Sequence, residues 1–524
     1  MPCSSVSQTE LPGVTRLFAD IAYHPERTAR FYRHPLRDLD SFRAAASAVD
    51  FAPERRAALV AALRVQNPAS PALDRLAQPG TFAVAAGQQV GLFSGPAYTV
   101  YKALHAARLA EWLTAQGLPA VPIFWLATED HDFAEVDHAW VFNAQHRPAK
   151  IEMQRQTGVQ PVGGVEVTAP PIEELRAAMA GLPFCDEVVA LVEESYATGR
   201  TMGQAFGDLL RRLLARFDIP QLDPMLPAFR ELAAPVLRKA VEMAPELTAA
   251  MLDRNRELVE AGYHAQVHVE PQTAFFFLLE DGKRLALRRN GDEYRANGRS
   301  FPSAELAARA AGLSPNALLR PVVQDSILPN VASILGPAEA AYLAQSEVLY
   351  SRILGRMPVA VPRAGFTVVD NRSQKRMDRY GLALADFFHG KEALRERMAA
   401  ALVPPDLALR MRDTVVDVDA AVERLRMRLL DFDPTLAKAL STSARKIRHQ
   451  VAKIEAKTGR EVMRRDDRAC RDAASLYGLI YPERHLQERL YSILPLVAKH
   501  GFDLVDRVYE SIRIDSADHG LLVL

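Results

Sequence analysis

Apolar and polar positions between residues 80 and 140 alternate between strand-like and helix-like patterns. The apolar run FAVAA (82–86) is followed by a glycine-containing loop, GQQVGLFSGP (87–96). Residues 97–113 then carry apolar positions at three- and four-residue spacing, which predicts a helix. A second apolar run, VPIFWLA (121–127), ends directly in the polar segment TEDHDFAEVDH (128–138). The pattern predicts strand, loop, helix and strand, with polar chemistry at both strand ends.

Continuous apolar runs are typical of parallel strands buried on both faces, and open parallel sheets bind ligands beyond the carboxyl ends of their strands. The same pattern returns at residues 320–355 and 357–370. We therefore expect an α/β fold with a Rossmann-like parallel sheet. Its expected parts are a helical lead-in packed on the core (1–79), the first half of the core (80–145), mixed α/β connecting insertions (146–315), the second half of the core (316–375), a helical coiled-coil arm (376–480), and C-terminal helices that return to the core (481–524).

Two further patterns concern the insertion and the arm. Residues 271–298 predict an antiparallel meander, because apolar FFFLL is followed by a DG turn, LALRR and NGDEY. Apolar residues from Leu436 to Ile454 recur at four- and three-residue spacing among charged positions, which indicates a coiled coil. AAVERLRMRLL (420–430) is its expected antiparallel partner through the DFDP turn (431–434), and Gly459 is expected to interrupt the second helix.

Composition limits the function classes. The chain has 524 residues and a formal net charge of zero, which gives no general argument for a nucleic-acid or acidic-membrane partner. Its three cysteines are far apart and suit a reducing compartment. The N-terminal residues lack the pattern of a secretion signal, and no run of about 18 apolar residues predicts a membrane span. We expect a cytoplasmic protein that binds neither nucleic acid nor membrane.

The glycine loop is the first candidate site. Glycines before a helix N-terminus let backbone N–H groups approach an anion, and Lys102 in the second helical turn adds a full positive charge. The glycines match neither the dinucleotide fingerprint nor the phosphate-binding P-loop, so a structural turn is an equal alternative. Gln88 and Gln89 favour binding, because adjacent amides at a strand end bring no packing benefit.

The acidic segment after the second strand is the second candidate site. Glu129, Asp130, His131 and Asp132 are consecutive, and Asp137 and His138 follow closely. Carboxylates and imidazoles are usual ligands of divalent metals, and a carboxylate beside an imidazole also makes a general base. The alternative is an acidic helix N-terminus, which the helix dipole favours.

A glycine loop and an acidic segment after successive strands resemble the arrangement of the class I nucleotidyl transferases. The chain has no literal HIGH or KMSKS motif, and His105 and SQKRM (373–377) are only loose counterparts. A closer resemblance covers almost the whole chain. Its segments GQQVGLFSGPAYTVYK, VPIFWLATEDHDFAEVDH, LSPNALLRPVVQDSILPNVASILGPAEAAYLAQ and YPERHLQER are similar to the signature segments of the cysteine ligases of bacillithiol biosynthesis, the cysteine-adding enzymes.

This resemblance implies a Rossmann-like core, a coiled-coil arm, homodimerisation through that arm, and a reaction that joins L-cysteine to the amine of glucosaminyl malate. A carboxylate is a poor electrophile, so ATP or another nucleotide with Mg²⁺ is the expected activator, through an adenylate or an acyl phosphate. No tightly bound metal is expected. The residues expected to cradle phosphate or carboxylate oxygens belong to the glycine loop and its helix: Gly87, Gln88, Gln89, Ser94, Gly95, Tyr98 and Lys102.

The attacking amine must lose its charge, and His131 with Asp130 or Asp132 is the expected base. Glu129 and Asp132 are alternatively candidates to hold Mg²⁺ on the nucleotide. Arg320 and Arg363 suit the carboxylates of glucosaminyl malate, with surface salt bridges as their alternative. A further set is expected to line the sugar pocket: Gln324, Asp325, Asn330, Gly336, Glu339 and Tyr342. Helix capping is the alternative for Glu339.

Two other functions stay open from the residues alone. A metal-dependent hydrolase would use the EDHD cluster (129–132) as its ligands. A non-catalytic scaffold would use the coiled-coil arm as its functional part.

Overall fold

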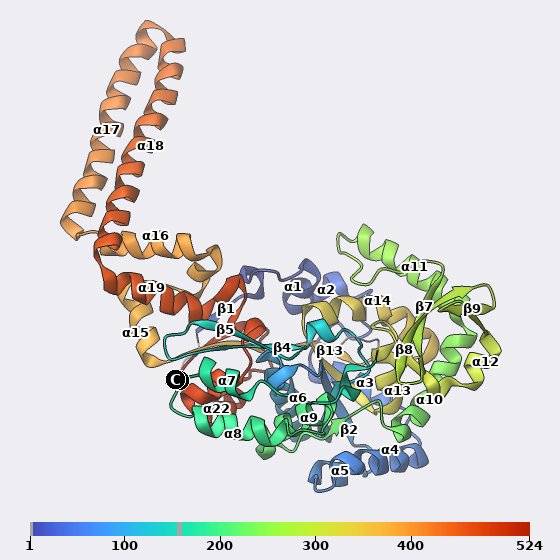
Figure 1. The fold of residues 1–524 in the computed structure, drawn as a ribbon. Helices are drawn as coiled ribbons and strands as arrows, with labels where there is room; N and C mark the ends of the chain where they lie inside the picture. The colour runs from blue at the N-terminus through green and yellow to red at the C-terminus, as the bar shows by residue number, and fades with distance from the viewer. Residues whose placement is uncertain (1–3, 155–159) are drawn as a thin grey trace. The chain divides into compact units, whose positions relative to one another are not determined.

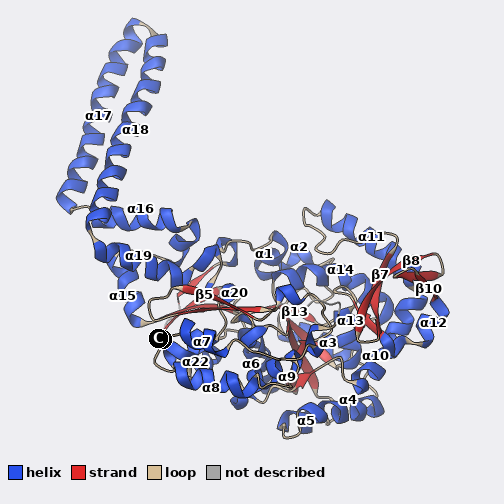
Figure 2. Ribbon diagram, in the orientation of Figure 1, coloured by secondary structure: helices blue, strands red, loops and turns tan. Residues whose placement is uncertain are grey.

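The computed structural model describes residues 4–154 and 160–524. Its backbone contacts separate two compact units, each assembled from several stretches of the chain. The first unit contains residues 1–144, 148–367 and 487–522, and the second contains residues 145–147, 368–486 and 523–524. The large sheets belong to the first unit, whereas the second is almost entirely helical (Figures 1 and 2). No helix within the described ranges is both long and apolar enough to cross a membrane.

A five-stranded parallel sheet organises the first unit, as the apolar runs predicted. Its strand order is β13-β12-β2-β3-β6. The chain adds β3 and β6 on one side of β2 and later adds β12 and β13 on the other. Strands β2 and β12 therefore meet where the strand order reverses, which is where sheets of this kind bind ligands. The bounds are Phe82–Gln89 for β2, Ala120–Ala127 for β3, Gln221–Leu222 for β6, Asn330–Leu335 for β12 and Val359–Pro362 for β13.

Two helices begin at this reversal point. Helix α6 (Tyr98–Ala115) leads from β2 to β3, and α14 (Pro337–Ile353) leads from β12 to β13. Most residues of both helices are buried, because each packs in the interior rather than on one exposed face. The helices predicted after the glycine loop and after Gly336 are thereby confirmed.

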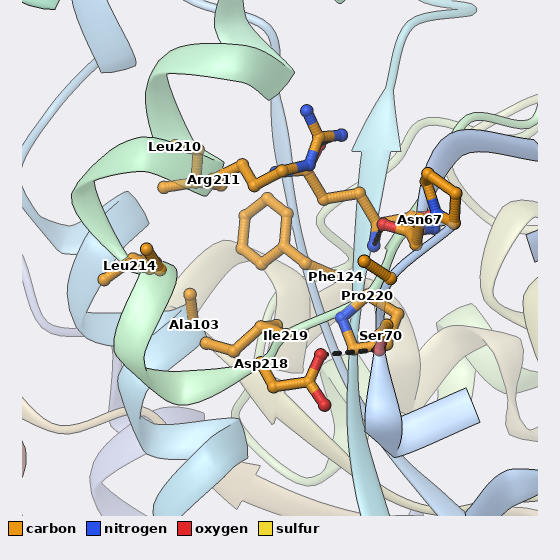
Figure 3. A pocket seen from close by; sticks show the side chains of 14 residues that line it. Asn67, Ser70, Ala103, Phe124, Leu210, Arg211, Leu214, Asp218, Ile219 and Pro220 are labelled. Atoms are coloured by element: carbon orange, nitrogen blue, oxygen red, sulfur yellow. Dashed lines mark hydrogen bonds between the residues drawn. The ribbon is translucent and has the colours of Figure 1, made fainter. Parts of the chain in front are cut away.

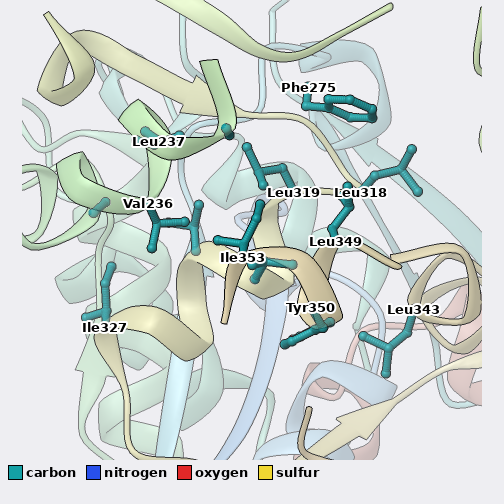
Figure 4. Close-up of a cluster of buried hydrophobic side chains, with 14 of the residues drawn as sticks. Val236, Leu237, Phe275, Leu318, Leu319, Ile327, Leu343, Leu349, Tyr350 and Ile353 are labelled. Carbon is teal, nitrogen blue, oxygen red and sulfur yellow. The ribbon is translucent and has the colours of Figure 1, made fainter. Parts of the chain in front are cut away.

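The core extends from the sheet into the inserted region. Buried apolar side chains of α10 (Pro227–Glu242), α13 (Arg320–Ile327) and α14 pack together with Phe275 of β7 (Thr273–Glu280) (Figure 4). Leu237, Leu319 and Leu349 are among them, and each is fully buried. Close packing of such groups provides most of the stabilisation of a domain of this size.

The predicted meander is confirmed. Asp281 and Gly282 have positive φ values of 51° and 71°, as a tight hairpin turn requires. The sheet has the order β10-β9-β8-β7-β11. The bounds are Thr273–Glu280 for β7, Lys283–Asn290 for β8, Glu293–Ala296 for β9, Arg299–Pro302 for β10 and Leu313–Pro315 for β11.

The remaining elements surround these sheets. Two smaller sheets contain β4 (His138–Phe142) with β5 (Pro148–Glu152), and β1 (Ser4–Val6) with β15 (His519–Val523) and β14 (Gly365–Val369). The other α-helices of the first unit are α1 (Arg16–Tyr23), α2 (Pro25–Thr28), α3 (Leu39–Ser47), α4 (Pro53–Gln66), α5 (Pro71–Leu76), α7 (Ile172–Ala178), α8 (Cys185–Ser195), α9 (Met202–Leu213), α11 (Ala244–Glu260), α12 (Ser303–Ala308), α20 (Gln487–Leu490), α21 (Leu494–His500) and α22 (Leu504–Ser511).

The second unit contains the predicted helical hairpin. Helices α17 (Pro405–Phe432) and α18 (Pro434–Arg465) lie side by side, and Asp433 caps the second helix by accepting from the Thr435 amide at 2.7 Å (Figure 1). Its other helices are α15 (Asn371–Arg379), α16 (Lys391–Leu402) and α19 (Asp467–Ile480). The prediction that Gly459 interrupts the second helix is wrong. Gly459 is needed for close packing instead, because a Cβ there would lie 3.3 Å from Cβ of Ala399 on α16.

Candidate functional site: a cationic cluster where the sheet reverses

Lys102 lies in α6 and its side chain is 2% exposed. Its ammonium group donates to the Gly87 carbonyl at 2.9 Å and to Oε1 of Gln88 at 3.0 Å. Nζ also lies 2.5 Å from Oε2 of Glu339. Burial lowers the pKa of Lys102 below its ordinary value, Glu339 opposes that effect, and Arg363 adds to it. Lys102 thus joins the end of β2 to the start of α14.

Glu339 caps its helix, which was the alternative to its predicted place in the sugar pocket, and it also pairs with Lys102. Its Oε2 accepts from the Gly336 amide at 2.8 Å, which caps the N-terminus of α14, and the same oxygen pairs with Lys102. The cap therefore fixes the carboxylate that faces the lysine.

Arg363 follows β13 and is buried. Its guanidinium carbon lies 4.9 Å from the centre of the Tyr98 ring. Its Nε lies 3.7 Å from the position that a Cβ at Gly336 would take, so glycine allows the guanidinium to approach α14. Tyr98 accepts a long hydrogen bond of 3.3 Å from Gln88. Arg363 is therefore an interior part of the cluster and not a surface salt bridge.

Arg320, the third cation, lies at the start of α13. It donates to the Tyr342 hydroxyl at 2.9 Å and to Oε1 of Gln324 at 3.2 Å. Burial raises the pKa of Tyr342 to about 12, although Arg320 opposes that effect, so the phenol stays a neutral donor and acceptor at neutral pH. We call Lys102, Arg320 and Arg363 the cationic cluster. Glu339 pairs with Lys102, and its charge also acts on Arg320 and Arg363. A group of three cations suits an anionic ligand.

The glycine loop itself is tightly folded. Phe93, Ser94 and Gly95 have φ values of 50°, 74° and 62°, and a Cβ at Gly91 would lie 3.0 Å from Cα of Gly95. Left-handed conformations at non-glycine residues cost on the order of 1–3 kcal/mol each and persist where the surroundings enforce them. The Tyr196 hydroxyl does so here by accepting from the Phe93 amide at 2.9 Å. Ser94 is fully buried, so Ser94 and Gly95 shape the loop.

The acidic segment forms a second polar group beside β2. Gln89 donates to Asp130 at 2.6 Å and to Glu135 at 2.9 Å. Asp130 also accepts from the His131 amide at 2.7 Å. The side chain of Glu129 is buried and lies 2.5 Å from Nη1 of Arg230. The first two carboxylates of the segment are therefore engaged with protein donors.

His131 contacts a residue that the sequence patterns did not single out. Arg284, from the meander, donates to Nδ1 of His131 at 3.1 Å and stacks on Phe277 with 3.9 Å between its guanidinium carbon and the ring centre. With its Nδ1 lone pair engaged, neutral His131 carries its proton on Nε2. Arg284 thus occupies the Nδ1 lone pair of His131 in this structure.

Comparison with known proteins decides the family. Residues 1–364 match the family model described as bacillithiol biosynthesis BshC, N-terminal Rossmann-like domain, and residues 366–524 match that of its C-terminal coiled-coil domain. The chain belongs to the BshC family. The family resemblance seen in the motifs is thereby confirmed, as is the combination of a Rossmann-like parallel-sheet domain with a helical coiled-coil domain.

Three relatives show how far the similarity extends, and each is named "Putative cysteine ligase BshC". The protein of Solibacter usitatus is 64% identical over the full length of both chains. The protein of Koribacter versatilis is 37% identical over 96% of each chain. The protein of Salinibacter ruber is 29% identical over 96% of this chain and 95% of its own. The predicted enzyme class, a cysteine ligase, is confirmed by this similarity.

The two predicted Mg²⁺ ligands, Glu129 and Asp132, lie in different surroundings. Glu129 is paired with Arg230, whereas Asp132 is exposed. Among residues 4–154 and 160–524, no three histidine, cysteine, aspartate or glutamate side chains converge as a metal site requires. Glu129 is engaged by Arg230, and the alternative that Glu129 and Asp132 hold Mg²⁺ on the nucleotide stays a prediction. The described residues give no support to a hydrolase that uses the EDHD cluster as its ligands.

Asp325 and Asn330 take part in a buried network that supports the sheet. Asp325 accepts from Asn330 at 2.8 Å and from Gln324 at 3.1 Å, and it has a short contact with the Tyr350 hydroxyl. Asn330 accepts from the Ala85 amide at 3.1 Å, where the β2–β12 pairing is irregular. Because both residues are fully buried and bonded within the fold, the structure favours a supporting role for them over the predicted place in the sugar pocket.

Other side chains were missed or misjudged from the sequence. His105 accepts from the Ala364 amide at 3.0 Å, and burial lowers its pKa to about 3, so it is a neutral core residue. Arg230 and Arg284 contact the acidic segment, but nothing in the local pattern marked them. Glu488 lies in the motif YPERHLQER and binds Arg363. The motif itself gave no sign that Arg363 is the partner of Glu488.

A separate cavity of about 340 Å³ lies beside β3 and α9 (Figure 3). Its wall is mostly apolar and includes Phe124, Leu210 and Ile219. Asp218 at its edge accepts from the Ser70 hydroxyl at 2.5 Å. None of the three residues of the cationic cluster lines this cavity, so it is distinct from the candidate site.

Proposed function

We propose that this chain joins L-cysteine to the amine of glucosaminyl malate, with nucleotide-dependent activation of the cysteine carboxylate. The proposal is supported by one observation above all: Lys102 pairs with Glu339 where β2 and β12 meet, and the charge of Glu339 also acts on Arg320 and Arg363. Both the activating nucleotide and glucosaminyl malate are polyanions, and a buried group of cations compensates such charges better than exposed lysines do.

Lys102 and the backbone at Gly87 are assigned to the nucleotide. The ammonium group is held at the carboxyl end of β2, at the edge where parallel sheets bind nucleotides. Mg²⁺ is expected to arrive on the phosphates of ATP, since it usually keeps several waters and binds through substrate phosphates. ATP supplies the leaving group that makes the cysteine carboxyl carbon electrophilic.

Arg320 and Arg363 are assigned to the two carboxylates of glucosaminyl malate. A planar guanidinium binds a carboxylate through two parallel N–H groups, which also orients the substrate. Tyr342 and Gln324, which bind Arg320, are assigned to the sugar hydroxyls. Glucosaminyl malate is thereby oriented by residues of α13 and α14 and by Arg363, just beyond β13.

His131 is assigned to the amine. When the C–N bond forms, the amine gives up a proton and the activated carboxyl group loses its phosphate-bearing oxygen. Nδ1 of His131 accepts that proton once Arg284 has turned toward an incoming carboxylate. Asp130, whose Oδ1 lies 3.8 Å from Nδ1, stabilises the imidazolium that results.

The decisive experiment incubates the purified protein with ATP, Mg²⁺, L-cysteine and glucosaminyl malate. We expect bacillithiol to form together with one equivalent of AMP and pyrophosphate or of ADP and phosphate, which identifies the activated species. Product without nucleotide consumption would contradict the activation step. Nucleotide consumption that depends on cysteine but not on glucosaminyl malate would contradict the proposed acceptor.

We also propose that the arm forms a homodimer. Every residue of α17 remains at least partly exposed, and Val416 and Phe432 are 66% and 82% exposed. A helical hairpin that leaves such residues in water gains stability by packing against a second copy.

A further inference from the structure

The motif YPERHLQER places Glu488 against Arg363. Nη2 of Arg363 lies 2.5 Å from Oε1 of Glu488, and the two side chains are 7% and 2% exposed. Oε2 of Glu488 accepts from the Phe366 amide at 2.9 Å. Both carboxylate oxygens are therefore held, one by the guanidinium and one by the backbone of β14.

The same C-terminal segment reaches the glycine loop. The Ala97 amide, immediately before α6, donates to the Tyr491 carbonyl at 2.7 Å. Residues near position 490 consequently contact both the loop and Arg363, although they are far from either in the sequence.

The absence of a side chain at Gly365 provides the space that the Glu488 carboxylate occupies. A Cβ at this position would lie 3.0 Å from both oxygens of Glu488 and 2.9 Å from Nδ1 of His519. The φ angle of Gly365 is not in the left-handed region, so the requirement for glycine here is one of space. Burial raises the pKa of Glu488, but Arg363, His519 and the Phe366 amide outweigh burial and hold that pKa below its usual range.

Stability alone is a weak explanation for this pair. Desolvation of two charges offsets most of their attraction, and a well-packed apolar pair is often as stable. The pair does fix the direction of the guanidinium. Nη1 donates to the Ala364 carbonyl and Nη2 to Glu488, while Nε lies beside Gly336 and the guanidinium carbon lies over the Tyr98 ring.

We propose that Glu488 is a positioning residue that orients Arg363 to bind a carboxylate of the amine substrate, with Gly365 providing the space that the carboxylate needs. The inference rests on the assignment of Arg363 to glucosaminyl malate. Glu488 also offsets one of the three charges of the cationic cluster, so that Lys102 and Arg320 do not displace the guanidinium from its place.

Calorimetric titration tests the inference without requiring turnover. Glu488→Gln keeps the shape of the side chain and removes its charge. We expect it to weaken the binding of glucosaminyl malate by at least tenfold and to change the affinity for ATP by less than threefold. Gly365→Ala, which displaces Glu488 but keeps both charges, is expected to have the same selective effect, and Glu488→Asp to restore part of the affinity.

Glu347→Gln is the matched control, because Glu347 also pairs with a buried arginine, Arg254, at 2.7 Å. We expect this variant to bind glucosaminyl malate like the unchanged protein. Equal losses of affinity for both ligands in the Glu488 and Gly365 variants would show a merely structural role and overturn the inference, as would no loss at all. If Glu488→Gln does not fold, the Gly365 and Glu488→Asp variants decide the question. Failure of bacillithiol formation would overturn the proposed reaction but leaves this binding test intact.

Discussion

Gln88 and Gln89 are adjacent at the end of β2, yet their side chains join different polar groups. Gln88 accepts from Lys102 at 3.0 Å, whereas Gln89 donates to Asp130 at 2.6 Å. Successive residues of a strand point to opposite sides, so one strand end supports both the cationic cluster and the acidic segment. The residues proposed to bind anions and those proposed to transfer the proton are therefore connected through the adjacent amides of Gln88 and Gln89.

Lys102→Met is expected to weaken ATP binding by roughly 10- to 100-fold, because a hydrogen bond to a charged group contributes about 1.5–3 kcal/mol. The dissociation constant is measured by calorimetry. Lys239→Met removes an ammonium group that donates to the Ile353 carbonyl and serves as the control. Unchanged ATP affinity in the Lys102 variant would contradict the assignment.

The pH dependence of ATP binding is expected to reveal the Lys102–Glu339 pair. Burial lowers the pKa of Lys102, so its charge, and with it the anion affinity, is lost at lower pH than for an exposed lysine. Glu339 opposes this effect. Glu339→Gln is therefore expected to move the loss of affinity to still lower pH. The affinity for ATP is measured by titrations at several pH values. A shift of the loss of affinity toward higher pH in the Glu339 variant would rule out the coupling between Lys102 and Glu339.

His131→Asn is expected to lower kcat for bacillithiol formation by about 10²- to 10⁴-fold, the usual contribution of a general base, with little change in ATP affinity. His138→Asn is a control from the same segment, since His138 lies 2.9 Å from the Asp137 carboxylate. Steady-state kinetics of both variants distinguish the two histidines. Equal activities would remove His131 from the proposed mechanism.

Asn330→Ala is expected to destabilise the protein by about 1–3 kcal/mol and to leave the affinity for ligands unchanged. The substitution deprives the buried Asp325 of a donor and the Ala85 amide of its acceptor. Thermal unfolding provides the measurement, and Ser333→Ala, which removes a single hydrogen bond of this network, should cost less. A stable variant with impaired binding of glucosaminyl malate would return Asn330 to the sugar pocket.

The double variant Val416→Asp and Leu425→Asp is expected to convert a dimer into a monomer, because both side chains are at least half exposed on α17 and would carry charge into an apolar interface. Sedimentation velocity gives the mass. Arg412→Asp and Arg428→Asp together change charge on the same helix and control for electrostatic effects. A monomeric unchanged protein would exclude the proposed assembly.

The periodicity of the chain predicted the parallel strands, the meander and the helical hairpin, because these depend on local apolar spacing. It also indicated two cations of the cluster, since Lys102 lies in the helix predicted after the glycine loop and Arg363 lies just beyond a predicted strand. The prediction for Gly459 failed because helix packing against Ala399 outweighs the helix-breaking tendency of glycine.

The sequence by itself determined the family, the elements and the candidate residues at the strand ends. Only the tertiary structure decided their partners: Arg230 for Glu129, Arg284 for His131, and Glu488 for Arg363. Each of these pairs joins segments that are far apart in the chain, and a buried charge takes whichever opposite charge or donor the packing brings within hydrogen-bonding distance. Local sequence patterns do not encode which distant residue becomes the partner. Residues of the same type are therefore candidates for ligand binding at one position and structural supports at another.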